Sequence, residues 1–260
     1  MVDYLNNYFR LTGKTAAVIG GGGVLAGTMS EGLAQAGADV VILDINLDNG
    51  QKKAAQLSKY DIRSSAIRVD ASRRDDLQQA ADTIKQHYGR CDILINAPGV
   101  NSSTPFFEIE EDEWDRILDI NLKSIFLSCQ IFGTMMLESG RGGSIINISS
   151  ASAGPPLSKV FTYGISKAGI NNLTQYLARE WATSGIRVNA IAPGFFPAEQ
   201  NRKILTEERV NSIMNHTPMK RFGEPEELVG AVIWLSSDKA SSFVTGAIIH
   251  VDGGFSAMTI

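Results

Sequence analysis

Tyr163 and Lys167 are the residues in this sequence whose types and spacing could carry out chemistry. On a helix, a separation of four residues places both side chains on one face, one turn apart. A lysine ammonium favours the phenolate form of a neighbouring tyrosine, so we expect the pKa of Tyr163 to be lowered towards neutrality. Such a phenol can exchange a proton with a substrate hydroxyl near pH 7. An ordinary exposed helix pair has the same spacing, so the elements around the pair must decide.

Length, composition and charge narrow the class of protein. The chain has 260 residues, of which 43% are hydrophobic and 20% are charged, as in globular proteins. A net charge of −4 gives no electrostatic reason to expect nucleic acid or an anionic membrane as a partner. We find no signal peptide and no apolar run of membrane-spanning length, so we expect a cytoplasmic protein that acts on a small molecule. Cys91 and Cys129 have no metal-type spacing and are expected to be buried free thiols.

The first 44 residues have the pattern of a dinucleotide site. A short apolar strand is expected at 14–19, followed by the glycine run 20–23, a helix at 24–36 and a second strand at 39–43 that stops at Asp44. Glycines let the backbone approach a pyrophosphate, and the helix N-terminus offers free N–H groups to it. A flexible hairpin turn is the alternative for the glycines alone. A carboxylate at Asp44 can bind ribose hydroxyls and repels a 2′-phosphate, which favours NAD over NADP.

The alternation of strands and helices continues to the end of the chain. Further strands are expected at 62–69, 92–95, 144–148, 186–192 and 247–251. Further helices are expected at 47–59, 73–88, 111–138, 162–183, 199–215 and 224–237. This pattern predicts an α/β fold with a Rossmann-type, doubly wound parallel sheet in a single domain spanning 1–260.

Chemistry-bearing residues follow the ends of many of these strands. Ligands of doubly wound sheets bind beyond the carboxyl ends of the strands, near the point where the strand order reverses. We therefore expect the following residues to converge on one rim: Gly20–Gly23, Asp44, Asp70, Asn96, Ser149, Ser150, Pro193 and Gly194.

With these motifs the sequence resembles the classical short-chain dehydrogenase/reductase family over essentially its whole length. Ser150 lies thirteen residues before Tyr163, as the active-site serine of that family does. The matching motifs are the glycine turn at 20–26, Asp44, Asp70, Asn96-Ala97-Pro98-Gly99, Asn121, Ser150, Tyr163-x-x-x-Lys167, Pro193-Gly194 and Asp252-Gly253.

The resemblance implies a role for each of four catalytic residues. Tyr163 would donate and accept the proton, and Lys167 would hold the nicotinamide ribose and lower the pKa of the tyrosine. Ser150 would bind the substrate oxygen and stabilise developing charge, although a strand-end cap is the alternative reading of this serine. Asn121 would hold a kink in its long helix and a water in a proton relay with Lys167; its alternative is a solvated polar group on a helix.

The resemblance also implies the residues that bind NAD. They are Gly20, Gly23, Val24, Leu25, Asp44, Asp70, Ala71, Asn96, Ala97, Tyr163, Lys167, Pro193 and Gly194. The sequence departs from the family pattern in several motifs, and the family's Asn-Asn-Ala-Gly is here Asn96-Ala97-Pro98-Gly99. Val24 and Ala26 replace two glycines, and Ile19 and Ala198 replace two threonines, so the phosphate and nicotinamide contacts are expected to differ in detail.

Substrate choice is expected to depend on the segment 195–216, a polar lid after Pro193-Gly194. Ser150 and Tyr163 are expected to contact the substrate at the reacting carbon. Arg202 could bind a substrate carboxylate through two parallel hydrogen bonds, and the alternative is that Arg202 lies on a solvated helix face. Segments 20–25 and 193–202 resemble a subgroup of mannonate/fructuronate oxidoreductases, which favours a sugar acid or polyol. A 3-oxoacyl thioester reductase and a non-catalytic dinucleotide-binding regulator remain alternatives. The resemblance further implies a homotetramer, with subunit contacts from residues 111–138, 160–183 and 243–251.

Overall fold

The computed structural model describes residues 4–197 and 206–258. Its seven strands are β1 (Thr15–Ile19), β2 (Asp39–Asp44), β3 (Ser64–Arg68), β4 (Ile93–Asn96), β5 (Gly143–Ile148), β6 (Ile186–Pro193) and β7 (Ile248–Val251). The helices of the sheet's two outer layers are α2 (Val24–Gln35), α3 (Leu47–Leu57), α4 (Arg74–Tyr88), α5 (Glu111–Leu118), α6 (Ser124–Ser139), α7 (Phe161–Trp181) and α10 (Val229–Ser236). Each predicted strand is present, with its ends shifted by no more than two residues.

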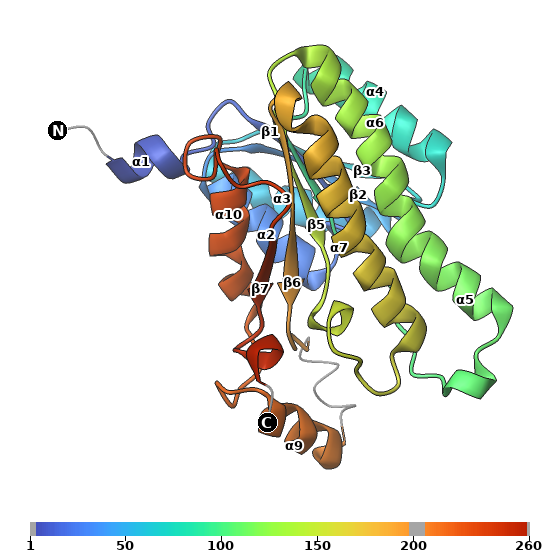
Figure 1. Ribbon diagram of the computed structural model, residues 1–260. Helices are drawn as coiled ribbons and strands as arrows, with labels where there is room; N and C mark the ends of the chain where they lie inside the picture. The colour runs from blue at the N-terminus through green and yellow to red at the C-terminus, as the bar shows by residue number, and fades with distance from the viewer. Residues whose placement is uncertain (1–3, 198–205, 259–260) are drawn as a thin grey trace.

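The strands form one parallel sheet in the order β3-β2-β1-β4-β5-β6-β7 (Figure 1). The order proceeds outward from β1 in one direction through β2 and β3, and in the other direction from β4 to β7. The reversal between β1 and β4 is the switch point of a doubly wound sheet. The predicted Rossmann-type fold is confirmed.

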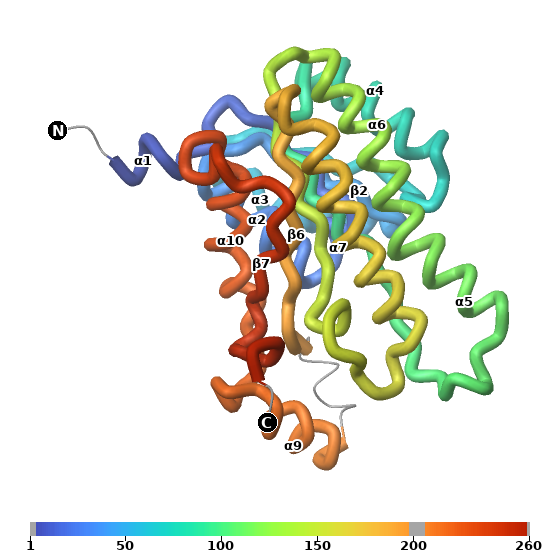
Figure 2. The backbone as a smooth tube through the Cα atoms, in the orientation of Figure 1, coloured from blue at the N-terminus to red at the C-terminus, as the bar shows by residue number. Residues whose placement is uncertain are grey.

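Two hydrophobic cores cover the two faces of the sheet. Successive side chains of a strand point to opposite faces, so Ala17 and Ile19 belong to one core, and Ala16 and Val18 to the other. The first core is completed by α4, α6 and α7, and the second by α2, α3 and α10 (Figure 2). Because both faces are covered, β1 reads as a continuous apolar run and not as an alternating one.

The helix expected at 111–138 is interrupted by a π-helical turn. This turn, Asp119–Lys123, separates α5 from α6 and contains the fully buried Asn121. By length and hydropathy the run 111–139 could cross a membrane, which corrects the expectation that no segment of such length exists. However, 61% of its most apolar window is buried inside the fold, so packing in the core accounts for its apolar character.

Two helices, one near the start of the chain and one after β6, differ from the predicted elements. A short helix that the sequence did not indicate, α1 (Tyr4–Phe9), is held through a bond from Ser237 Oγ to the Tyr8 carbonyl. The helix expected at 199–215 appears as α9 (Glu207–His216), because Thr206 Oγ accepts a 3.2 Å hydrogen bond from the Arg209 N–H and caps it there. Residues 198–205 lie outside the described part of the chain. In Figure 1, α9 lies beyond the carboxyl ends of β6 and β7.

Candidate active site

The glycine run forms a tight turn between β1 and α2. Gly20 has φ +76°, a conformation that favours glycine, and an added Cβ would lie 2.8 Å from the carbonyl oxygen of Ala97 at the end of β4. Gly23 N–H donates to the Gly20 carbonyl at 3.0 Å and closes the turn. The ends of β1 and β4, the two strands of the switch point, therefore approach each other closely at Gly20.

The first turn of α2 presents free backbone donors at this place. Gly23 is the N-cap residue and makes no side-chain capping bond. The N–H groups of Val24, Leu25 and Ala26 have no partner within the helix, because the first turn of any helix lacks acceptors for them. Free N–H groups and the positive end of the helix dipole bind phosphate. The turn thus fits a pyrophosphate although Val24 and Ala26 replace the usual glycines.

Asp44 ends β2 and faces the glycine turn. Its Oδ2 accepts a 2.9 Å bond from the Gly22 N–H and its Oδ1 a 2.9 Å bond from the Asn46 N–H. The carboxylate is half-buried, and each oxygen keeps a second lone pair for a ribose hydroxyl. The sequence analysis did not identify Lys53 of α3. Its amino group packs against Gly27 of α2, where a Cβ added to the glycine would lie 3.4 Å from Lys53 Nζ. A cation therefore lies against α2, one helical turn beyond Gly23.

The side chain of Asn96, a predicted cofactor residue, points into the core, so any contact with the cofactor would have to come from its backbone at the end of β4. It is fully buried, donates to Asn147 Oδ1 at 2.8 Å and to Cys129 Sγ at 3.4 Å, and accepts from Ser128 Oγ at 2.7 Å. Its amide is therefore committed to the core of the sheet. Cys129 and Cys91 are buried free thiols, as predicted, and burial raises the pKa of each to about 12.

The other predicted cofactor residues lie at strand ends along the same rim. Asp70 Oδ1 accepts bonds from the N–H and the hydroxyl of Ser72, at 3.0 and 2.6 Å, and Ala71 between them is half-buried. Gly194 N–H donates to the Val251 carbonyl at 3.0 Å, and an added Cβ would lie 2.7 Å from Asp252 Cα. Pro193, the last residue of β6, is buried directly before it.

Ser150 and Tyr163 lie together on the carboxyl side of β5. Ser150 Oγ accepts bonds from the N–H and the hydroxyl of Ser152, at 3.2 and 2.9 Å, so it also caps the short helix Ala151–Ala153. A hydrogen bond with Ser150 acts on the Tyr163 hydroxyl and opposes the effect of burial on its pKa. The serine therefore combines the cap with a contact to the phenol.

Lys167 is buried under the tyrosine, one turn further along α7. Its Nζ donates a 2.8 Å bond to the carbonyl oxygen of Ile148 and lies 5.5 Å from the centre of the Tyr163 ring. Burial without a carboxylate partner lowers the pKa of Lys167 to about 8.

We expected the pKa of Tyr163 to be lowered, and for the protein without a bound ligand this prediction is wrong. Burial raises the pKa of Tyr163 above its usual value, and the hydrogen bond with Ser150 offsets only part of this rise. The reason is that the ammonium of Lys167 is directed to a backbone carbonyl and not to the phenol oxygen. Helix spacing gave the correct neighbours, but it carried no information on how deeply they are buried.

Asn121 connects the loop after β4 with the helix of Tyr163 and Lys167. Its Oδ1 accepts from the Val100 N–H at 2.8 Å, and its Nδ2 donates to the Val100 carbonyl at 2.9 Å and to Ser166 Oγ at 3.0 Å. Ser166 Oγ in turn donates to the Tyr163 carbonyl at 2.7 Å. These bonds exclude a merely solvated role, and they need the π-helical turn that carries Asn121.

The side chains of Asn121 and Lys167 both face the position where Gly99 lacks a side chain. A Cβ at Gly99 would lie 3.6 Å from Lys167 Nζ and 3.7 Å from Asn121 Oδ1. Both polar atoms therefore border the same glycine. Ser166, Val100 and the Ile148 carbonyl were missed by sequence reasoning; the two backbone groups have no side-chain signal at all.

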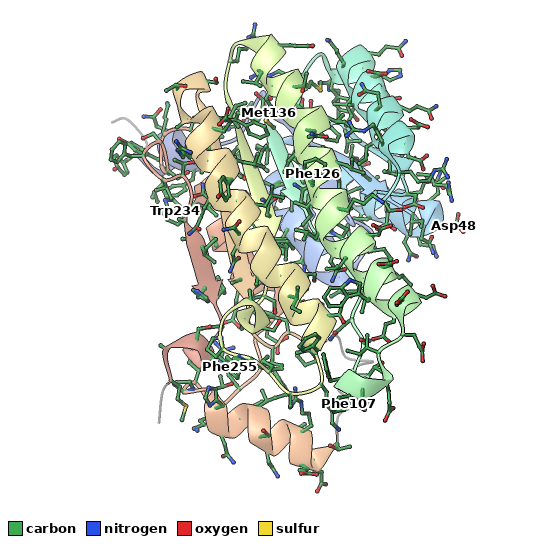
Figure 3. All side chains as sticks on the ribbon, turned by 45° about the vertical axis from the view of Figure 1, so that its right-hand side comes forward. Asp48, Phe107, Phe126, Met136, Trp234 and Phe255 are labelled. Atoms are coloured by element: carbon green, nitrogen blue, oxygen red, sulfur yellow. The ribbon has the colours of Figure 1, made fainter. Side chains whose placement is uncertain are left out.

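A cavity of about 950 Å³ lies between α9 and the loop 155–158, which belongs to the segment between Ser150 and Tyr163; neither of these two residues lines it. Phe195 and Phe255 form its inner wall, with ring centres 5.3 Å apart, and His216 packs on Phe255 at 4.6 Å. Figure 3 shows Phe255 above α9. The described parts of the predicted lid at 195–216 contribute to the cavity wall, and His216 is one of the lining residues. Arg202 lies outside the described residues.

The groups at this rim can transfer a proton and hold a dinucleotide. A phenol, a hydroxyl and a buried amine lie near one strand end, and a phosphate cradle with a ribose acceptor lies at the switch point. Within residues 4–197 and 206–258, no group of three or more His, Cys, Asp and Glu side chains could hold a metal ion.

Comparison with known proteins places this arrangement in a family. The family model described as enoyl-(acyl carrier protein) reductase matches residues 23–256. A D-threitol dehydrogenase of Mycolicibacterium smegmatis is 35% identical, with 95% of this chain and 94% of the relative covered. The chain belongs to the classical short-chain dehydrogenase/reductase family and is an oxidoreductase that acts on CH–OH groups with a nicotinamide dinucleotide.

Two solved structures are similar over nearly the whole chain. A candidate D-mannonate oxidoreductase from Haemophilus influenza, with bound NAD, has a TM-score of 0.92 and 33% identity, covering 99% of both chains. A gluconate 5-dehydrogenase from Burkholderia cenocepacia, in complex with NADP and tartrate, has a TM-score of 0.93 and 31% identity, covering 98% of this chain and 100% of the other. Neighbours of this fold thus bind either dinucleotide.

Proposed function

We propose that this protein interconverts a secondary alcohol and a ketone on a sugar acid or polyol, with NAD(H) as the cofactor. The observation that carries the proposal is the placement of Tyr163 and Ser150 beyond the end of β5, with Ser150 close enough to act on the pKa of the phenol and the buried Lys167 Nζ 5.5 Å from the Tyr163 ring centre. A phenol and a hydroxyl that converge on one point can both bind the oxygen of a substrate carbonyl.

The residues divide the reaction between them as follows. A bound nicotinamide supplies or accepts the hydride at the carbinol carbon. In the reductive direction Tyr163 donates its proton to the ketone oxygen, while Ser150 donates a hydrogen bond to the same oxygen and stabilises the developing charge. The resulting tyrosinate lies beside Lys167, whose charged form stabilises it. Asn121 and the space at Gly99 provide a place for a water that returns the proton.

Asp44 supports NAD as the preferred dinucleotide. A 2′-phosphate would approach a carboxylate that is already bound to the Gly22 and Asn46 N–H groups and cannot turn away without losing both bonds. Charge repulsion therefore disfavours NADP. Lys53 at Gly27 is the cation that would moderate this preference.

The lining of the cavity supports a hydroxylated substrate. Side chains of α9 supply hydrogen-bonding groups to it: Arg209, Asn211, Ser212, Asn215 and His216. The names of the similar proteins, a threitol dehydrogenase, a candidate mannonate oxidoreductase and a gluconate dehydrogenase, agree with such a substrate. Within this class we propose the mannonate/fructuronate type, on the resemblance of segments 20–25 and 193–202. We assign the segment 195–216 as the lid over this cavity within one catalytic domain.

Exposed aromatic side chains support self-association as a homotetramer. Phe126 on α6 and Tyr176 on α7 are exposed and border one groove between the two helices, and Figure 3 shows Phe126 on the outer side of α6. Phe243, before β7, is also fully exposed. Apolar surface of this kind is typical of subunit interfaces. Light scattering on the purified protein tests the tetramer by measuring the mass of the particle in solution. We also propose that the protein is cytoplasmic.

An initial-rate screen tests the proposed function. Sugar acids, polyols and their keto forms are offered with NAD⁺, NADP⁺, NADH and NADPH, and reduced nicotinamide is followed by its absorbance. We expect turnover of a sugar acid or polyol, faster with NAD(H). Turnover of a 3-oxoacyl thioester alone would contradict the proposal. Binding of NADH without turnover of any compound would favour a non-catalytic regulator, a reading that the presence of Ser150, Tyr163 and Lys167 opposes.

A further inference from the structure

The cavity between the loop 155–158 and α9 is lined by Arg209, and most of the N–H donors of its guanidinium have no acceptor among the described residues. Arg209, in the first turn of α9, lines the cavity and is half-buried. Its Nη1 donates a 2.9 Å bond to Ser158 Oγ on the opposite wall. No carboxylate among the described residues pairs with Arg209, and its Nε and Nη2 have no hydrogen-bond acceptor there. A guanidinium has five N–H donors, so one edge of Arg209 is available to a ligand.

Arg221, in the turn after α9, differs from Arg209 because it is paired with a carboxylate. Its Nη1 and Nη2 bind the two carboxylate oxygens of Glu227 at 2.7 and 2.6 Å, which is the bidentate geometry that a guanidinium prefers. The side chain of Glu227 thus fills the position that stays open at Arg209. Arg221 is a structural ion pair, and Arg209 offers the same geometry to a partner that is not part of the described chain.

The two acidic residues next to Arg209, Glu207 and Glu208, do not pair with it, and their position at the start of α9 accounts for them. Glu207 and Glu208 also line the cavity, but both are exposed residues of the first turn of α9, where carboxylates interact favourably with the helix dipole. His216 at the other end of the helix is engaged with the Phe255 ring. Arg209 is therefore the one cationic side chain among the described lining residues that reaches the opposite wall.

The bond to Ser158 relates Arg209 to the catalytic residues. Ser158 belongs to the segment that leads from Ser150 to Tyr163, and the same segment forms one wall of the cavity. A molecule held at Arg209 is therefore held against the loop between the two groups that bind the reacting oxygen. Hydroxyls along the molecule meet the polar side chains of Ser212 and Asn215.

We propose that Arg209, positioned by Ser158, binds the carboxylate of the substrate, so that the enzyme acts on open-chain sugar acids in preference to neutral polyols. This inference rests on the proposed function and selects between its two substrate classes. It assigns to Arg209 the role that the sequence alone suggested for Arg202.

The test compares D-gluconate with D-glucitol, which differ at the carboxylate carbon. For Arg209→Met we expect the ratio of kcat/KM for gluconate to kcat/KM for glucitol to fall about 10- to 100-fold, as expected for loss of a charge-assisted bidentate contact. Arg209→Lys keeps the charge without the fork and should lose less. Arg74→Met, whose side chain contacts Gln130 on another surface, is the control and should leave the ratio unchanged. An unchanged ratio in Arg209→Met would overturn the inference.

Calorimetry separates this inference from the proposed function. Binding of gluconate to the enzyme with NADH is measured for the native protein, Arg209→Met and Ser158→Ala. We expect the dissociation constant to rise about tenfold or more in Arg209→Met and less in Ser158→Ala, whether or not gluconate is turned over. Equal binding in the native protein and Arg209→Met would refute the role of Arg209. Weakened binding without turnover of any sugar acid or polyol would instead refute the proposed reaction.

Discussion

Lys167 donates its hydrogen bond to the carbonyl oxygen of Ile148, at 2.8 Å, and not to the hydroxyl of Tyr163. Ile148 is the last residue of β5, two residues before Ser150, so the bond fixes α7 to the strand end that carries the serine. It also places a buried amine under the phenol, with Nζ 5.5 Å from the ring centre. The lysine therefore supports the geometry of both catalytic groups, and its burial has a measurable cost.

The stability of the protein should reveal this cost as a function of pH. Burial lowers the pKa of Lys167 to about 8, against 10.5 for an exposed lysine. Between these pH values the unfolded chain holds a proton that the folded chain has lost, so the free energy of unfolding rises with pH across this window. In urea denaturation, the difference in this free energy between the native protein and Lys167→Met should grow by about 2 kcal/mol from pH 8 to pH 10, because the opposing loss from the buried thiols of Cys91 and Cys129, whose pKa values are raised to about 12, is common to both proteins.

Lys167→Met is the matched variant for that measurement. It removes the titrating group, so its stability should lack the rise between pH 8 and pH 10, although its turnover is lost. The raised pKa of Tyr163 acts only above pH 10, where the folded chain keeps a proton that the unfolded chain loses and stability falls. Identical pH profiles of the two proteins would show that Lys167 is not a buried titrating amine.

Asp44→Ala should change the choice of dinucleotide. The carboxylate repels a 2′-phosphate and accepts bonds from ribose hydroxyls, so its removal should weaken NAD and relieve the exclusion of NADP. We expect the ratio of kcat/KM for NAD⁺ to that for NADP⁺ to fall about tenfold or more.

Lys53→Met in the Asp44→Ala background refines this experiment. The ammonium of Lys53 lies against Gly27 at the same end of the site, and it should become the partner of the 2′-phosphate once Asp44 is gone. The double variant should therefore use NADP⁺ less well than the single variant. An unchanged NAD/NADP ratio in Asp44→Ala would remove the carboxylate from cofactor selection.

Asn121→Ala should slow catalysis more than it weakens cofactor binding. The substitution deletes three hydrogen bonds, two to Val100 and one to Ser166, and leaves buried partners unsatisfied. We expect a loss of about 1–3 kcal/mol in the free energy of unfolding and a fall of about 10- to 100-fold in kcat.

Ser166→Ala separates the relay from the packing. It removes the bond to Asn121 and the bond to the Tyr163 carbonyl, but it leaves the Asn121 side chain in the site. If Asn121 acts through a water in proton return, kcat should fall much less in Ser166→Ala than in Asn121→Ala, at comparable stability loss. Equal losses of kcat in the two variants would reduce Asn121 to a structural residue.

The sequence predicted the sheet well because the sheet is parallel and buried on both faces. Its strands read as apolar runs that end in glycine, aspartate or serine, and parallel strands bring those ends to one rim. Gly20, Asp44 and Ser150 were found in this way, and Tyr163 was found from its helical spacing to Lys167. These positions required no knowledge of packing, only the direction of the strands and the period of a helix.

Packing decided the points that the sequence did not. The inward side chain of Asn96, the π-helical turn around Asn121 and the depth of Lys167 all depend on what surrounds them in three dimensions. The sequence analysis selected Arg202 in the lid and passed over Arg209. The bond from Arg209 to Ser158 across the cavity has no signal in the sequence.

Tyr163→Phe tests the central claim most directly. The variant removes one oxygen and keeps the ring that packs over Lys167. Turnover of the best substrate and the dissociation constant of NADH are measured on the same preparation. We predict that kcat falls about 1000-fold, while the dissociation constant of NADH stays within about threefold of the native value. Undiminished turnover in Tyr163→Phe would contradict the account.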